Sequence, residues 1–246
     1  MTALAVIGGT GVAALSGLKI LREQLYLTPF GEPSGPFAFG ELHGKELAFL
    51  ARHGPGHSIP PHRVNYRANI WALKQVGAPR IVAIAAVGGI SAEMWPSRLA
   101  FPHQIIDYTS SRAHTFFEST DVAVTHIDFT EPYSAELRTL LIQGAADASL
   151  DACNHGTYGA TQGPRLETAA EIDRLQRDGC TMVGMTGMPE AALARELELA
   201  YATCAVVANW AAGRGGAPIT IAGLETNLKS GMEQVNRLLR AVIARL

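Results

Sequence analysis

The chain has 246 residues, of which 48% are hydrophobic, so it is long enough to bury a sizeable core. A formal net charge of -2 and dispersed lysines and arginines argue against a nucleic-acid partner. The first residues lack a signal-peptide pattern and no apolar run approaches the length of a membrane span, so we expect a cytoplasmic protein without a membrane partner. The three cysteines, Cys153, Cys180 and Cys204, suggest neither a disulfide framework nor a thiolate metal site, and we expect buried thiols.

Strand-like and helix-like patterns alternate along the chain. Apolar, β-rich runs occupy residues 3–8, 46–52, 80–88 and 201–209, and helical patterns occupy residues 64–77, 134–149 and 223–246. This alternation predicts an α/β fold with a mixed, largely parallel sheet. Because no repeat or low-complexity linker interrupts it, we expect one domain spanning residues 1–246. The Pro- and Gly-rich residues 28–44 are expected to form a surface turn that leads into a strand.

Four loops with chemically useful residues follow strand-like runs: "GGTG", "RHGPGHSIPPH", "AVGGIS" and "NWAAGRGG". A fifth polar stretch, "TQGPRLETAAE", begins with turn residues and runs into a helix. Ligands of open α/β sheets bind beyond the carboxyl ends of the strands. We therefore expect these loops to converge on a single crevice.

The glycine-rich turn near the start has three interpretations. Residues 9–14 fit the G-x-G-x-x-G/A dinucleotide fingerprint, which would indicate a nicotinamide dehydrogenase. That motif also requires an acidic residue at the end of the next strand, and "LREQLYLTPFGEP" offers no clear βαβ unit. Alternatively, backbone N–H groups and the Thr10 hydroxyl hold a free phosphate, or the glycines only permit a tight turn.

The second loop favours the free phosphate. A guanidinium fork at Arg52 can bind two phosphate oxygens, and the His53 imidazole a third. His53, His57 and His62 also raise a metal hypothesis, but their spacing matches no standard zinc pattern and no cysteine or carboxylate lies near them in the sequence. We expect no metal.

Several motifs together resemble one family. "GGTG", "ARHG" with "VNYRANIWALK", "AVGGI", "GPRLET" and "VGMTGMPEAALARE" occur in the order and spacing of the trimeric purine nucleoside phosphorylase and methylthioadenosine phosphorylase family. The resemblance runs from the first strand to the last helix. It implies a single α/β domain with a distorted, barrel-like mixed sheet flanked by helices, a homotrimer, and phosphorolysis of an N-glycosidic bond. Inorganic phosphate would be a co-substrate, with no metal or organic cofactor.

The resemblance also implies site residues. Thr10, Arg52, His53 and Thr186 would contact phosphate, beside the loop at Ala85 and Ala86, where methylthioadenosine phosphorylases have a threonine whose hydroxyl this chain lacks. Glu167 and Asn209 would recognise the base, with Asn209 beside purine N7 as charge arrives on the leaving group. The remaining substrate contacts would come from Val87, Gly88, Leu166, Met185, Ala211, Ile221 and Leu224. His126 resembles the residue that a neighbouring subunit contributes near the 5′ position.

The base is expected to be a 6-oxopurine. Methylthioadenosine phosphorylases carry aspartates at the positions of Asn209 and Ala211 and a serine at that of Glu167, whereas the 6-oxopurine enzymes use Glu and Asn. The resemblance therefore favours methylthioinosine, with methylthioadenosine, general inosine or guanosine phosphorolysis, and a non-catalytic nucleoside-binding protein as alternatives. Without it, Glu167 would be interpreted as a helix-start carboxylate and Asn209 as a strand-end turn residue.

Overall fold

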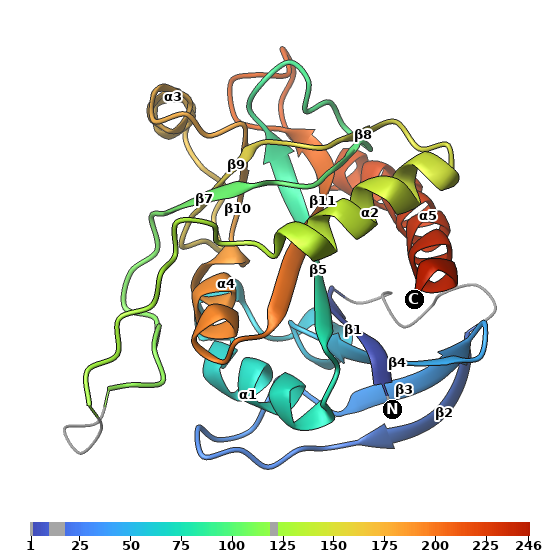
Figure 1. Cartoon of the computed structure of the whole chain (residues 1–246). Coiled ribbons are helices and arrows are strands. Elements are labelled where there is room, and N and C mark those ends of the chain that lie inside the picture. The colour runs from blue at the N-terminus through green and yellow to red at the C-terminus, as the bar shows by residue number, and fades with distance from the viewer. Residues whose placement is uncertain (1, 10–17, 119–122) are drawn as a thin grey trace.

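The computed structural model describes residues 2–9, 18–118 and 123–246 (Figure 1). The four predicted strands are present as β1 (Thr2–Gly8), β4 (Lys45–Ala51), β5 (Arg80–Gly89) and β11 (Ala200–Trp210). The shorter strands are β2 (Lys19–Gln24), β3 (Phe37–Leu42), β6 (Leu99–Ala100), β7 (Gln104–Asp107), β8 (Ala152–Cys153), β9 (Thr157–Ala160) and β10 (Met182–Gly184).

The predicted helices are present as α1 (Tyr66–Val76), α2 (Ala135–Asp147) and α5 (Ile221–Arg245). Two more helices follow "GPRLET" and "VGMT": α3 (Ala169–Arg177) and α4 (Gly187–Glu196). Short 3-10 turns at Pro55–His57 and Pro61–Arg63 lie within the loop after β4. The mixed α/β fold is thus confirmed.

One mixed sheet contains all the described strands, and β5 is its central member. Along one edge β5 pairs in parallel with β1 and then antiparallel with β10, while β11 runs parallel to it along the other edge. The sheet therefore branches at β5. The start of β10 and the carboxyl end of β11 both lie beside the carboxyl end of β5. This end, where β1, β4 and β5 also finish, is where the predicted loops begin.

Alternation along the central strands divides the core into two layers. Ala5, Ile7 and Ala83 pack in one cluster with residues of α1 and α4, whereas Val6 and Ile84 pack in the other with α2 and α5. Since successive side chains of a strand point to opposite faces, these buried strands are apolar on both sides. Figure 1 shows α2 and α5 side by side on one face and α1 near α4 on the other.

The expectation for residues 28–44 is wrong in its second half. Phe37 and Phe39 are buried in β3, which pairs antiparallel with β4 across a tight turn at His43 and Gly44. Both turn residues have positive φ, of 51° and 72°, as a two-residue hairpin requires. The glycines and prolines around "FAFGEL" make its alternation of inward and outward side chains hard to recognise in the sequence. This alternation places the phenylalanines in the core.

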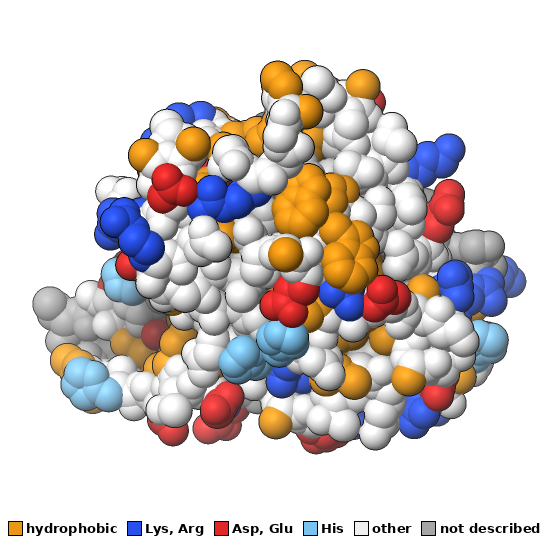
Figure 2. Space-filling model, turned by 90° about the horizontal axis from the view of Figure 1, so that it is seen from above, with side chains coloured by type: hydrophobic (Ala, Val, Ile, Leu, Met, Phe, Trp, Pro, Cys, Tyr) orange, Lys and Arg blue, Asp and Glu red, His pale blue; other side chains and the backbone are white. Residues whose placement is uncertain are grey.

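The structure can be compared with the expectations for the cysteines, the charge distribution and membrane spans. Cys153, Cys180 and Cys204 are free and buried, as expected. On the face seen in Figure 2, basic and acidic side chains are intermixed and no large area carries one sign of charge. Among the described helices, none is both long and apolar enough to cross a membrane.

Candidate functional site

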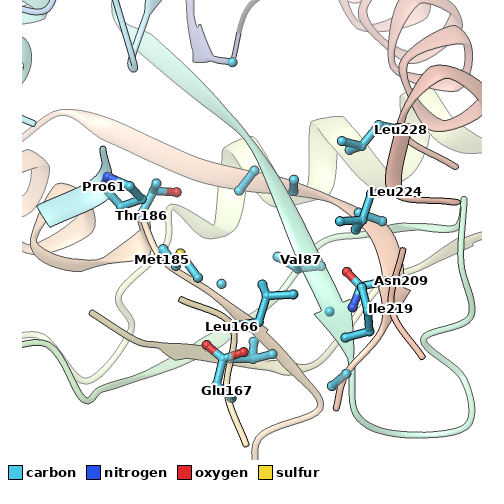
Figure 3. A pocket seen from close by; sticks show the side chains of 18 of the residues that line it. Pro61, Val87, Leu166, Glu167, Met185, Thr186, Asn209, Ile219, Leu224 and Leu228 are labelled. Carbon is cyan, nitrogen blue, oxygen red and sulfur yellow. The ribbon is translucent and has the colours of Figure 1, made fainter. Parts of the chain in front are cut away.

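The five predicted loops converge on one cavity of about 280 Å³, shown in part in Figure 3. Of the expected site residues, the lining includes Arg52, His53, Ala85, Ala86, Val87, Gly88, Leu166, Glu167, Met185, Thr186, Asn209, Ala211 and Leu224. The lining residues that the sequence did not single out for the site are Gly9, His57, Pro61, Ile84, Val183, Gly184, Ala208, Ala212, Ile219 and Leu228. Thr10 lies outside the described residues.

The contacts of Arg52 differ from the expected two-point contact with phosphate. Its Nε and Nη2 donate to the two carboxylate oxygens of Glu190 at 2.6 and 2.8 Å, so the fork is already occupied by an ion pair. Nη1 donates to the carbonyl of Ile84 at 3.0 Å, and the second Nη2 hydrogen is directed to the carbonyl of Ile7 at 3.4 Å. Arg52 is only 1% exposed and Glu190 is fully buried, and Tyr201 donates to the same carboxylate. At most the remaining Nη1 hydrogen is free for a ligand, so a bidentate grip on phosphate is wrong for this arrangement.

His53 faces the cavity in a defined tautomer. Its Nδ1 lies 2.8 Å from the carbonyl oxygen of Ile59, which can only accept, so Nδ1 carries the proton and Nε2 keeps a lone pair. Burial, followed by the positive charge of Arg52, lowers the pKa of His53 to about 4. The imidazole is therefore neutral near pH 7. The His57 ring packs against it in a tilted arrangement, with ring centroids 4.5 Å apart.

Thr186 stands where α4 begins, with its side chain beside the Tyr158 hydroxyl. It makes no side-chain cap hydrogen bond, and its backbone N–H donates to the Tyr158 hydroxyl at 3.3 Å. Met188 has non-helical φ and ψ of −117° and 140°, so Thr186 lies in the turn before the regular part of the helix, where its hydroxyl and the backbone N–H groups of the turn can meet an anion. Ala85 and Ala86 also line this end, but their side chains offer no hydrogen bond.

Asn209 is directed into the cavity by an irregularity in β11. The pairing with β5 slips between Val207 and Asn209, so the consecutive residues Ala208 and Asn209 both line the cavity. Nδ2 of Asn209 donates to the carbonyl of Trp210 at 2.6 Å, which fixes the orientation of the amide, because rotation would place two acceptors together. One N–H and the amide oxygen remain for a ligand. Asn209 is therefore part of a strand and not a turn residue.

Glu167 is not needed to start helix α3. Thr168 and Glu171 form the capping box, and Arg165 pairs with Glu171 at 2.7 and 2.8 Å. Glu167 instead accepts a hydrogen bond from Thr161 and lines the cavity. In Figure 3 its carboxylate lies across Leu166 from the amide of Asn209, so the two polar groups expected at the base flank the same space.

The apolar wall comes from α5 and the loop before it. Leu224 and Leu228 are one turn apart on the helix, and Ile219 precedes it. Ile221, expected in this wall, is 76% exposed and does not line the cavity. Thr220 caps the helix by accepting from Gly223 N–H, so the chain turns there and Ile219, before the cap, reaches the wall in place of Ile221.

His126 lies away from this cavity. It is exposed in the long segment between β7 and α2, where it lines a separate hollow with Tyr133 and Arg195. Its expected role at the site of a neighbouring subunit stays a prediction.

Arg112 links two segments of the site and was not predicted. Its guanidinium donates to the carbonyl oxygens of Thr161 and Gln162 on the Glu167 side, and to those of Met185 and Met188 on the Thr186 side. It also contacts the Gln162 side chain and the Tyr66 hydroxyl. No sequence signal connects an arginine in an irregular segment with carbonyl groups about fifty to seventy-six residues away.

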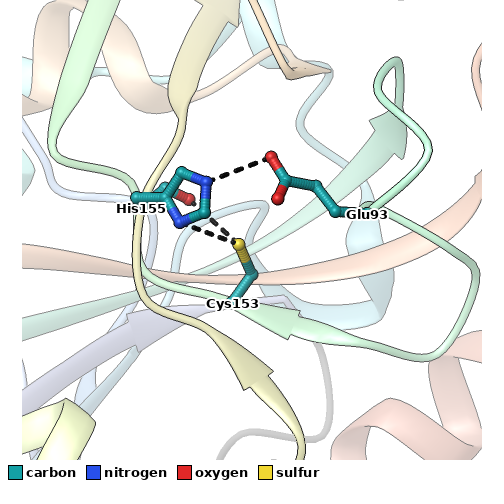
Figure 4. A group of neighbouring side chains, drawn as sticks. All are labelled: Glu93, Cys153 and His155. Atoms are coloured by element: carbon teal, nitrogen blue, oxygen red, sulfur yellow. Dashed lines mark hydrogen bonds and ion pairs between the residues drawn. The ribbon is translucent and has the colours of Figure 1, made fainter.

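One group of metal-ligand types occurs in the described part of the chain, and it does not include His53, His57 or His62. In it, His155 Nε2 lies 3.2 Å from Glu93 and Nδ1 lies 3.5 Å from Cys153 Sγ (Figure 4). Burial raises the pKa of the Cys153 thiol. The three side chains form a cluster that lies outside the lining of the cavity.

The comparisons with known proteins agree with this geometry. A family model described as the phosphorylase superfamily matches residues 3–244. The chain belongs to this superfamily. A probable S-methyl-5′-thioinosine phosphorylase of Pseudomonas syringae pv. tomato is 54% identical over 244 residues, 99% of each chain. The 6-oxopurine nucleoside phosphorylase of Pyrococcus furiosus is 45% identical over 99% of this chain and 92% of its own. The structure of the methylthioadenosine phosphorylase of Schistosoma mansoni with adenine matches with a TM-score of 0.92 and 30% identity, over 99% of this chain and 91% of that one.

Proposed function

We propose that the protein is a phosphorylase of 5′-methylthio-purine nucleosides with a 6-oxo base. It would convert S-methyl-5′-thioinosine and phosphate into hypoxanthine and 5-methylthioribose 1-phosphate. The observation that carries the proposal is that Glu167 and the oriented amide of Asn209 line the same cavity, which also has an apolar wall. Four curated relatives at 51–54% identity carry this name as probable activity.

The donor and acceptor pattern fits hypoxanthine. Its N1–H would donate to the Glu167 carboxylate, its O6 would accept from the free N–H of Asn209, and the Asn209 oxygen would accept from protonated N7. Adenine presents a bare N1 to the carboxylate and an amino group to the amide. Since Trp210 opposes rotation of the amide, at least one buried group would stay unpaired, at a cost of about 1–3 kcal/mol.

The other end of the cavity fits phosphate as a nucleophile. Cleavage of the glycosidic bond passes through an oxocarbenium-like transition state, which an anion held below C1′ stabilises and then attacks. Thr186, His53 and the start of α4 would hold that anion, and no covalent nucleophile on the protein is required. Inorganic phosphate would be the co-substrate, with no metal or organic cofactor.

The 5′ group would lie against Leu224, Leu228 and Ile219. An apolar wall buries a thiomethyl group but leaves a 5′-hydroxyl unpaired, which favours methylthio nucleosides over inosine by about 1–3 kcal/mol. In a homotrimer, His126 of the segment between β7 and α2 would complete a neighbour's site. Figure 1 shows the described residues on either side of 119–122 in this segment projecting from the body of the fold.

The second candidate is methylthioadenosine phosphorolysis, which the structural similarity to the adenine-bound Schistosoma mansoni enzyme favours. The test is a comparison of four nucleosides, inosine, adenosine and their 5′-methylthio forms, each with and without phosphate. We expect phosphate-dependent release of hypoxanthine from methylthioinosine with the highest kcat/KM. Higher kcat/KM for methylthioadenosine would contradict the base assignment, and base release with free sugar in phosphate-free buffer would indicate a hydrolase. Binding without turnover would indicate a nucleoside-binding protein.

A further inference from the structure

Glu167 is held by a single short hydrogen bond from Thr161. The Thr161 hydroxyl lies 2.6 Å from Oε1 of Glu167 and 3.3 Å from the carbonyl oxygen of Gly184. A hydroxyl has one hydrogen, so it can serve only one of these acceptors fully, and 2.6 Å is the length typical of O–H donation to a carboxylate. Thr161 thus donates to Glu167, leaving Oε2 as the oxygen without a contact from this hydroxyl.

The backbone of Thr161 is fixed from both sides. It directly follows β9, and its N–H donates to the carbonyl of Gly184 at 2.8 Å. Its own carbonyl accepts from Nη2 of Arg112 at 3.2 Å. A β-branched side chain has few rotamers, so the position of the hydroxyl follows from that of the backbone.

Among the described residues, the two neighbouring guanidinium groups form their hydrogen bonds with partners other than Glu167, and Arg165 acts on Glu167 only through its charge. The guanidinium of Arg165, two residues before Glu167, forms a two-point pair with Glu171. Arg112 donates to the oxygens around Thr161 and not to Glu167. The orientation of the Glu167 carboxylate therefore depends on the Thr161 hydroxyl.

We propose that Thr161 is a positioning residue that selects the 6-oxopurine base by holding Glu167 as an oriented acceptor. The inference rests on the proposed function. Hypoxanthine needs an acceptor opposite N1–H, which the Glu167 carboxylate supplies. Adenine has a bare N1, so the carboxylate that Thr161 holds would face a second acceptor there. Thr161 therefore assists the oxo base and opposes the amino base.

The test compares Thr161→Val, which keeps the shape and removes the hydroxyl, with Thr161→Ser, which keeps the hydroxyl. For Thr161→Val we expect kcat/KM for methylthioinosine to fall about tenfold or more, as on losing a hydrogen bond to a charged group. We expect kcat/KM for methylthioadenosine to change less than threefold. Thr161→Ser should keep the ratio of the two values near that of the unmodified protein. Thr157→Val, on the same strand and outside the cavity, is the matched control.

An unchanged ratio of the two kcat/KM values in Thr161→Val, or an equal loss in Thr161→Ser, would overturn the role of Thr161. If Thr161→Val does not fold, Thr161→Ala removes the hydroxyl without introducing a new methyl group, and the same ratio decides. If the unmodified protein prefers methylthioadenosine, the proposed base preference fails. The change in ratio between the unmodified protein and Thr161→Val still tests Thr161 in that case.

Discussion

Replacing Arg112 by lysine tests whether the two segments of the site depend on one side chain. Arg112 is 8% exposed and makes six hydrogen-bond contacts, four of them to backbone carbonyl oxygens. Lysine keeps the charge but has three hydrogens at a single atom, so it can serve at most three of these acceptors. Arginine has five N–H hydrogens, so the change removes at least two donors from a buried place.

The magnitude follows from that count. Each buried acceptor left without a donor costs about 1–3 kcal/mol, so two cost about 2 kcal/mol at the least. The loss separates the loop of Glu167 from the loop of Thr186, and a misplacement of about 1 Å in a catalytic site costs about a hundredfold in rate. We therefore expect Arg112→Lys to lower both the free energy of unfolding, by about 2 kcal/mol, and kcat/KM, by about a hundredfold.

The assay pairs urea unfolding with kcat/KM for methylthioinosine at saturating phosphate. Arg165→Lys is the control, because Arg165 lies near the same loop in an exposed pair with Glu171, and we expect this substitution to leave the unfolding transition nearly unchanged. If Arg112→Lys retains kcat/KM within threefold and unfolds at the same urea concentration as the unmodified protein, the reasoning is refuted.

Three further results are expected. Leu224→His should raise kcat/KM for inosine relative to methylthioinosine by giving the 5′-hydroxyl a partner, and an unchanged ratio would remove Leu224 from the 5′ pocket. Glu167→Ser combined with Asn209→Asp should move preference toward methylthioadenosine; competition between the two nucleosides measures this, and an unmoved preference would count against both residues. His53, whose pKa is about 4 when folded and near 6.5 when unfolded, takes up its proton on unfolding, so stability should fall as the pH drops from 6.5 to 4. His53→Asn should weaken that dependence in melting temperatures measured across the range, and an identical pH dependence would show that other groups cause it.

The sequence predicted the parts of the fold with strong periodicity. β1, β5 and β11 are long apolar runs, and α5 repeats its apolar residues at helical spacing, so each appears near its expected place. The strands β6 and β8 have only two residues each. Such strands carry no detectable alternation, and they exist because tertiary packing brings their partners together.

The sequence predicted the site residues that lie in short recognisable motifs. Glu167 and Asn209 lie in motifs, and the structure brings both to the cavity. Glu190 was missed as the partner of Arg52 because 138 residues separate them and only the fold joins them. A register shift in β11 directs Asn209 into the cavity, and the turn at the start of α5 exposes Ile221. Both are properties of backbone geometry, which composition does not predict.

The pairing of Arg52 with Glu190 changes how an anion would be recognised in the proposed reaction. The pair contributes no net charge, and His53 is neutral, so the cavity offers an anion hydrogen-bonding groups and the start of α4 in place of a free cation. Because Nδ1 of His53 donates to Ile59, its Nε2 can only accept, and in the proposed reaction it would pair with a protonated phosphate oxygen. Hydrogen phosphate has such an oxygen at neutral pH and sulfate does not. Sulfate should therefore compete poorly with phosphate, and inhibition by sulfate at concentrations near the KM for phosphate would show that Nε2 carries the proton.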